Sequence, residues 1–287
     1  MLEVTELTRA YGTQVAIERV SLRAADGELV TIVGPSGCGK STLLRCVAGL
    51  LQPTSGRVVL NGTPVTGVPD RLAVVFQDYS RSLYPWLSVR DNVALPLRRT
   101  ERRRATRQAA ALDALGAVGL TDTADKYPWQ LSGGMQQRVA IARALACDPV
   151  LLLMDEPFGS VDAQTREDLE DLVLRVRGER EITILLVTHD IDESVYTGDR
   201  VIVLTPAPGR VRADITVDLP RPRDQITTKE LREFTRLRTE VSRLVRGRVD
   251  SAPASLEWLA GDGGGLAAAQ QPAAGRGDQG QADQDGD

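Results

Sequence analysis

One glycine-rich segment limits the possible folds more than any other feature of this sequence. It follows an apolar run at 29–33, precedes a helical pattern at 42–51, and consists of Gly34, Pro35, Ser36, Gly37, Cys38, Gly39, Lys40, Ser41 and Thr42. This order matches G-x-x-x-x-G-K-[ST], in which glycines let successive backbone N–H groups point at phosphate oxygens beside a helix N-terminus. We predict a phosphate-binding loop in which Lys40 reaches the β and γ phosphates and Ser41 binds Mg²⁺, with a plain glycine turn as the alternative. Cys38 occupies an unspecified position of the motif, and we assign its thiol no chemistry.

A second apolar run, at 150–154, ends in two adjacent carboxylates, Asp155 and Glu156. An acid that emerges at the carboxyl edge of a parallel sheet can meet a metal bound at a phosphate loop, so Asp155 is the metal candidate. Glu156 is expected to face another way and is the candidate general base for an attacking water. The alternative is that the two acids only cap the turn before Pro157.

Apolar runs bounded by turn residues alternate with helical patterns along the chain, which is typical of a parallel sheet layered with helices. Strands are predicted at 29–33, 72–76, 150–154, 182–187 and 201–204. Asn61 and Gly62 lie between strand-like residues within 57–65, and an Asn-Gly pair in that position predicts a hairpin. The predicted fold class is therefore α/β, with an antiparallel β portion beside the parallel core.

Two amphipathic helices are predicted from apolar residues that recur at helical spacing. The first, within 98–120, has Ala109, Leu112, Leu115 and Val118 on one face and belongs to a helical subdomain inserted at about 80–145. The second follows residue 163 and has an apolar stripe of Leu169, Leu172, Val173 and Val176. The arginine-rich segment 98–107 is interpreted as a solvated helix face, with contact to lipid or a membrane subunit as the alternative.

Composition and charge argue against several classes of protein. The net charge of −4 over 287 residues gives no basic excess, so nucleic acid is not an expected partner. No apolar run reaches the ~18 residues that cross a bilayer, and the acidic start does not resemble a signal peptide, so the chain is expected to stay in the cytosol. Cys38, Cys46 and Cys147 lack metal-ligand or disulfide spacing and are predicted to be reduced, buried thiols. Beyond residue 250 Ala, Gly, Gln and Asp dominate, which predicts a domain at 1–250 and a disordered tail at 251–287.

A third motif lies between the phosphate loop and the paired acids. Its residues are Leu131, Ser132, Gly133, Gly134, Met135, Gln136, Gln137 and Arg138, followed by a helix-compatible run. Taken alone, Ser-Gly-Gly before a helix is only an N-cap signal. With the other two motifs in order, the segment resembles the signature motif of ATP-binding cassette (ABC) ATPases. The resemblance covers about residues 1–245 and implies a P-loop NTPase core that hydrolyses ATP with Mg²⁺.

The resemblance also implies roles for single residues. Tyr11 resembles the aromatic that stacks on adenine, and Gln77 resembles the glutamine that touches Mg²⁺ and senses the membrane partner. His189 resembles the histidine on the γ-phosphate, and the segment 160–162 resembles the loop that crosses the dimer interface. The alternatives are a surface aromatic for Tyr11, an ordinary loop amide for Gln77 and a structural histidine for His189.

Segments 84–93, 126–131, 208–210 and 218–224 resemble the nitrate, sulfonate and taurine importer group of ABC ATPases. The implied function is the energy-coupling subunit of an importer for a small solute, at the cytoplasmic face of the cell membrane. The implied partners are ABC membrane permease subunits, a second copy of the chain and, indirectly, a periplasmic or lipid-anchored solute-binding protein. In the implied head-to-tail pair, Ser132 and Gly134 of one copy cover the ATP on Lys40 and Ser41 of the other. A soluble ABC ATPase not coupled to transport is the alternative.

The membrane permease is expected to dock at 77–92. This segment links Gln77 to the aromatic residues Tyr84 and Trp86, and exposed aromatics favour partner contacts over water. The alternative is that Trp86 fills the core of the helical subdomain itself.

Overall fold

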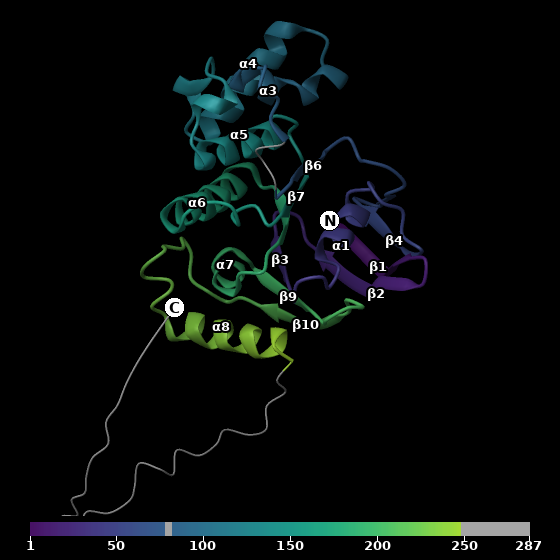
Figure 1. The fold of residues 1–287 in the computed structure, drawn as a ribbon. Coiled ribbons are helices and arrows are strands. Elements are labelled where there is room, and N and C mark those ends of the chain that lie inside the picture. The colour runs from purple at the N-terminus through teal and green to yellow at the C-terminus, as the bar shows by residue number, and fades with distance from the viewer. Residues whose placement is uncertain (78–81, 248–287) are drawn as a thin grey trace, which may run out of the picture. The chain divides into compact units, whose positions relative to one another are not determined.

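The buried strands of the central sheet bring the ends of distant segments together at one edge. The computed structural model describes residues 1–77 and 82–247 (Figure 1). A six-stranded sheet has the order β10-β9-β3-β8-β7-β6 and contains β3 (Leu29–Val33), β6 (Leu72–Val75), β7 (Leu151–Asp155), β8 (Thr183–Val187), β9 (Arg200–Leu204) and β10 (Val211–Thr216). Its strands are parallel except β10, which runs antiparallel to β9. Strands β3, β7 and β8 are buried along their whole length, which explains their continuous apolar sequence.

The predicted antiparallel portion forms a separate four-stranded sheet. It has the order β2-β1-β4-β5 and contains β1 (Leu2–Tyr11), β2 (Gln14–Ala24), β4 (Ser55–Leu60) and β5 (Thr63–Pro64). Asn61 and Gly62 connect β4 to β5 with φ of 49° and 77°. Two positive φ angles define the tight hairpin turn that the Asn-Gly pair predicts.

The helical region between β6 and β7 contains α3 (Val89–Ala94), η1 (Pro96–Arg99), α4 (Arg104–Ala117), η2 (Thr121–Thr123), η3 (Pro128–Gln130) and α5 (Gly133–Leu145). Helices α3, α4 and α5 contact one another and lie together at the upper end of the view in Figure 1. The stripe predicted for α4 is partly wrong, because Ala109 is exposed and Leu112 only half-buried. The buried face instead consists of Ala111, Ala114, Leu115 and Val118, whose three- and four-residue steps follow the true 3.6-residue period.

Four further helices cover the sheets: α1 (Lys40–Val47), α6 (Ala163–Arg180), α7 (Ile191–Thr197) and α8 (Arg232–Val245). Successive residues of a strand point to opposite faces, so Leu151 and Leu153 pack in the cluster of α1, whereas Leu152 and Met154 pack in the cluster of α5 and α6. The four apolar residues predicted to line α6 are all buried. Helix α8, which the sequence analysis did not predict, buries Phe234, Leu237 and Val241 in a cluster with α7 and β9.

Several predicted boundaries shift by a few residues. Strand β6 ends at Val75, so Phe76 lies outside it, and β7 is displaced by one residue so that Asp155 is its last member. Helix α1 begins at Lys40 rather than at residue 42 and ends at Val47. Residues 251–287 lie outside the described part of the chain, and within that part no helix is long and apolar enough to span a membrane.

All three cysteines are free thiols, as predicted. Cys38 and Cys46 are buried, but Cys147 is only partly buried, which corrects the expectation for that residue. Burial raises the pKa of Cys46 to about 11 and raises the pKa of Cys38 as well, so both thiols stay protonated at neutral pH.

Candidate active site

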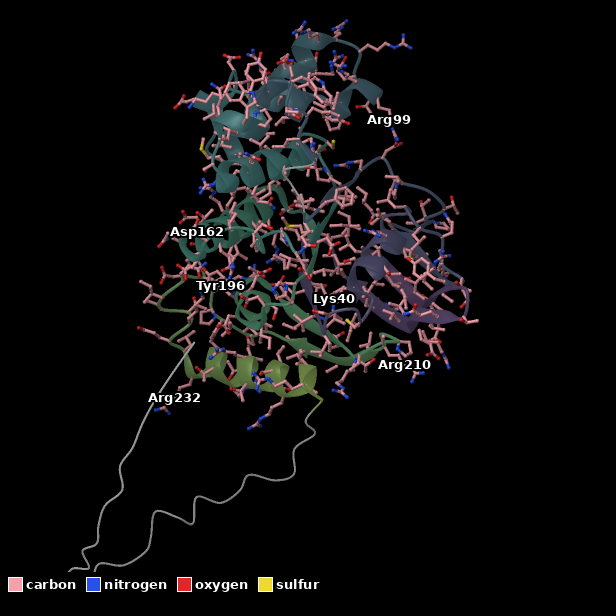
Figure 2. The ribbon with its side chains drawn as sticks, in the orientation of Figure 1. Lys40, Arg99, Asp162, Tyr196, Arg210 and Arg232 are labelled. Carbon is pink, nitrogen blue, oxygen red and sulfur yellow. The ribbon has the colours of Figure 1, made fainter. Side chains whose placement is uncertain are left out.

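The glycine-rich segment forms a tight loop between β3 and α1. Gly37 and Gly39 have φ angles of 75° and 96°, which residues other than glycine adopt only with backbone strain. A Cβ on Gly39 would lie 2.5 Å from the Cγ2 of Ile17, so β2 also packs too closely for any other residue there. Lys40 is buried, and its Nζ donates to the carbonyls of Gly34 at 2.8 Å and Pro35 at 3.2 Å (Figure 2). The loop therefore curls around its own lysine at the start of α1.

Ser41 and Asp155 meet across the edge of the sheet. The Ser41 hydroxyl donates to Oδ1 of Asp155 at 3.1 Å. Burial raises the pKa of Asp155, and the hydrogen bond from Ser41 opposes that shift by favouring the carboxylate. A hydroxyl and a carboxylate side by side suit Mg²⁺, which takes one or two protein oxygens and keeps phosphate and water oxygens as its other ligands. Among the described residues no group of three or more His, Cys, Asp or Glu could hold a metal ion.

Gln77, Glu156 and His189 converge although they follow three different strands. The Gln77 Nε2 donates to Oε2 of Glu156 at 3.1 Å, and the Nδ1 of His189 lies 3.1 Å from the same oxygen. Strands β6, β7 and β8 are neighbours, so the residues that follow their carboxyl ends share one edge. Glu156 has a φ of 46° and its N–H donates to the carbonyl of Val187 at 2.8 Å, which fixes the start of its side chain in a strained backbone.

The neighbourhood of His189 combines exposure with a small internal cavity. The His189 side chain is 60% exposed, whereas that of Glu156 is 20% exposed. Asp190, which follows His189 in the chain, caps α7 by accepting hydrogen bonds from the N–H groups of Asp192 and Glu193. A cavity of about 20 Å³ is lined by Glu156, Gly159, Arg166, Thr188, His189, Asp190 and Glu193. That volume holds about one water beside the Glu156 carboxyl group.

Tyr11 is the last residue of β1 and is 46% exposed. The guanidinium of Arg9 lies 4.8 Å from the centre of its ring, which is a cation–π contact. The contact with Arg9 orients the ring of Tyr11. Stacking of this exposed ring on adenine stays a prediction.

The signature segment builds the start of α5 in the helical region. Ser132 is exposed and caps α5, its hydroxyl accepting from the N–H of Met135 at 3.3 Å. A Cβ on Gly134 would lie 2.3 Å from Cγ2 of Thr165, so glycine lets α5 approach the first turn of α6. Asp162 caps α6 by accepting from the N–H and the hydroxyl of Thr165. Figure 1 shows α5, which Ser132 caps, apart from α1.

The comparisons with known proteins agree with this geometry. The model of the family described as "ABC transporter" matches residues 17–159. A putative ATP-binding protein of Brucella abortus (strain 2308) is 48% identical over 234 residues, covering 80% of this chain and 88% of that protein. The chain belongs to the ABC transporter family.

Two further relatives extend the comparison for this ABC transporter family member. The nitrate import ATP-binding protein NrtD of Synechocystis (strain PCC 6803) is 41% identical over 256 residues, covering 86% of this chain and 96% of that protein. The dimeric post-hydrolysis structure of the ATP-binding cassette MJ0796 with ADP and Pi is 34% identical, has a TM-score of 0.67, and covers 76% of this chain and 99% of that one. The chain is therefore an ABC ATPase that hydrolyses ATP, and its P-loop NTPase fold class is confirmed.

Two residues that shape the site of this ABC ATPase were not predicted from its sequence. Thr165 sits against Gly134, and Glu193 is buried beside the small cavity next to Glu156. Asp190 and Glu193 match the capping-box pattern, which could have indicated the start of α7. That pattern is local and does not indicate that Glu193 is buried.

The helical region of this ABC ATPase exposes two pairs of aromatic rings. Tyr84 and Trp86 lie 5.2 Å apart between ring centres, and Tyr127 and Trp129 lie 6.1 Å apart. Trp86 and Trp129 are each 70% exposed. The alternative in which Trp86 fills the core of the helical region is therefore wrong.

Proposed function

We propose that this chain is the energy-coupling ATPase subunit of an ABC importer for a small anion of the nitrate, sulfonate or taurine type. The family assignment supports the coupling role, and the 41% identity to a nitrate import ATP-binding protein supports an importer of anions. The observation that carries the proposal is the position of Gln77. Its amide contacts the Glu156 carboxylate, and the exposed pair Tyr84 and Trp86 follows shortly after it in the chain.

One group of residues binds the nucleotide and its metal ion. The backbone of the loop Gly34, Pro35, Ser36, Gly37, Cys38, Gly39, Lys40, Ser41 and Thr42 surrounds the phosphates, and the Lys40 ammonium group moves from the loop carbonyls to the β and γ phosphates. Ser41, Asp155 and Gln77 would hold Mg²⁺, which neutralises phosphate charge when bound. Tyr11 stacks on the adenine.

Glu156 and His189 act on the reacting groups. Glu156 takes the proton of the attacking water as general base, and its contact with His189 orients both side chains. His189 then faces the γ-phosphate, where a donor stabilises the charge of the transition state. Both residues follow buried strands, so the edge of the sheet positions them before the nucleotide binds.

A second copy of the chain completes the site. Ser132 and Gly134 lie at the exposed start of α5, whose N–H groups and helix dipole favour an anion, yet α5 lies apart from α1 of its own chain (Figure 1). In a head-to-tail pair, this end covers the ATP on Lys40 and Ser41 of the other copy. The pair binds membrane permease subunits at the cytoplasmic face of the membrane, and a periplasmic or lipid-anchored solute-binding protein acts on it indirectly.

The importer proposal is tested by co-purification with the encoded membrane permease in detergent. We expect Trp86→Ala to fold and hydrolyse ATP but to lose permease, because an exposed aromatic anchor contributes strongly to a partner interface. Trp129→Ala removes a tryptophan of the same exposure and is the matched control. Equal co-purification of the wild type and Trp86→Ala would contradict docking at 77–92. Failure of the wild type to bind any permease would favour a soluble ABC ATPase, and uptake of nitrate, sulfonates and taurine by the purified complex identifies the solute.

A further inference from the structure

A cavity of about 660 Å³ lies outside the ATP site, between α5, α6 and the segment 221–223. Its lining consists of Arg138, Asp168, Asp171, Leu172, Leu174, Arg175, Arg221, Pro222 and Arg223. The volume falls within the range of about 300–1,000 Å³ typical of small-molecule sites. Nothing in the hydrolysis of ATP uses these residues.

The positive charge of the lining exceeds its negative charge, with four arginines and two aspartates. Two of the arginines have a carboxylate partner: Arg221 pairs with Asp199, and Arg138 lies 3.9 Å from Asp168. Asp171, the other acid in the lining, already accepts hydrogen bonds from the Tyr196 hydroxyl at 2.6 Å and from the Gln225 amide at 3.0 Å.

Arg175 and Arg223 remain without a carboxylate partner among the described residues. Arg175 donates to the carbonyl of Ala117 at 3.2 Å, and Arg223 donates to the carbonyl of Tyr196, in α7, at 2.6 Å. The Nε of Arg223 is buried and has no hydrogen-bond partner. Its pKa is lowered to about 10 by burial first, and then by repulsion from Arg221 and Arg177. An unpaired, partly buried guanidinium is costly, and an anion in the cavity would offset that cost.

The rest of the lining is hydrocarbon. Leu172, Leu174 and Pro222 form apolar surface next to the arginines. We propose that this cavity binds a small organic anion, with a sulfonate or carboxylate group on Arg175 and Arg223 and a hydrocarbon body on the leucines and the proline. A guanidinium binds either group through parallel N–H donors.

Such a ligand would contact α5, the helix that begins in the signature segment. Arg138 belongs to α5 and also donates to the carbonyl of Val118 at 3.3 Å, while Arg175 of α6 holds the neighbouring Ala117 carbonyl. The two arginines thus connect the end of α4 to α5 and α6 and line the cavity as well. A bound anion engages the contacts that set the helical region against α6.

The proposal is tested by titrating the full chain with benzenesulfonate and with benzoate, using isothermal titration calorimetry. Saturating ADP and Mg²⁺ keep the phosphate loop occupied, so that it does not take up the probe. We expect one saturable site per chain for at least one probe, with affinity at least about tenfold weaker in Arg223→Gln and in Arg175→Gln, since each loses a charge-assisted hydrogen bond. Arg57→Gln changes an exposed arginine of β4, is the matched control and keeps wild-type affinity.

Unchanged ADP affinity shows that each variant is folded, and Arg175→Gln keeps the test decisive if Arg223→Gln does not fold. Absence of a saturable site for both probes would overturn the proposal. Wild-type affinity in Arg175→Gln and in a folded Arg223→Gln would also overturn it. So would inorganic sulfate that binds as tightly as benzenesulfonate, because the hydrocarbon body would then contribute nothing.

Discussion

Glu156 combines a strained backbone with contacts from both neighbouring strands. Its Oε2 accepts from Gln77 and lies beside His189, so its carboxylate is held where a water could be deprotonated. We expect Glu156→Gln to lower the turnover of ATP by roughly 10²–10⁴-fold, because the amide keeps the shape but cannot accept the proton. Phosphate-release assays measure turnover, and fluorescent-nucleotide titration should show retained ATP binding.

Lys40→Ala is the control for this substitution. It should instead weaken ATP binding itself, because the lysine contacts the loop that surrounds the phosphates. Turnover by Glu156→Gln within tenfold of the wild type would show that another group is the general base.

Glu170 is a second carboxyl group whose pKa is set by its surroundings. It is 3% exposed, and burial raises its pKa to about 7 although the Gln225 amide and Lys229 oppose the shift. Asp171, Asp190 and the buried Glu193 also face it and disfavour its charge. Between the usual pKa of 4.5 and about 7 the folded chain therefore binds more protons than the unfolded chain. The contribution of Glu170 to the stability is therefore greatest below that window and is lost as the pH rises through 7.

Glu170→Gln should remove this pH dependence, since the amide has no proton to lose. Relative to the wild type, its melting temperature should rise between pH 5 and pH 8, by the equivalent of up to roughly 3 kcal/mol. Calorimetric or spectroscopic melting at both pH values measures the difference, with the exposed Glu230→Gln as the control. A constant offset between Glu170→Gln and the wild type would contradict the assigned protonation.

At the level of elements, the contact between α5 and α6 depends on one glycine. A Cβ on Gly134 would overlap Cγ2 of Thr165, so Gly134→Ala should force the two helix starts apart and cost about 1–3 kcal/mol of stability. Thr165→Ser removes that methyl group and keeps the hydroxyl that Asp162 accepts from. The double variant should therefore recover most of the lost melting temperature. Failure of Thr165→Ser to restore it would show that overlap with this methyl group is not the cause of the loss.

At the level of the whole molecule, the proposed head-to-tail pair uses the exposed start of α5. With ATP and Mg²⁺, Glu156→Gln should form dimers in solution, because in the proposed pair the unhydrolysed nucleotide stays between Lys40 of one copy and Ser132 of the other. Light scattering after size exclusion measures the mass with and without ATP. Ser132→Arg in the same background should prevent the dimer, and a Glu156→Gln chain that stays monomeric at saturating ATP would contradict head-to-tail pairing.

The buried core of the described residues consists of three clusters. The three buried clusters draw on residues between Leu2 and Val241, with Leu244 and Val245 packed against the last of them. Removal of 252–287 should therefore leave ATP turnover unchanged and shift the melting temperature by about 2 °C or less. A larger shift would show that the predicted tail contributes to the fold.

The sequence by itself determined five strands of the central sheet to within about one residue, and the hairpin at 57–65, but it did not indicate β1, β2 or β10. Buried parallel strands must be apolar throughout, and an Asn-Gly pair adopts the positive φ angles of a tight turn, so both patterns are local. Parallel strands end at one edge, which is why Gln77, Glu156 and His189 lie together although they follow three different strands. The roles of Gln77 and His189 were predicted only through the resemblance to ABC ATPases.

Only the tertiary structure decided which side chains are buried, paired or exposed. Glu170 and Gln225 meet across 55 positions of sequence, and the burial of Glu193 follows from packing that no local pattern describes. The same holds for the exposed ring of Trp86, because a tryptophan is equally compatible with a buried core and with a docking surface. Periodicity is set within a few residues, whereas burial and charge partners depend on elements that are brought together only when the chain folds.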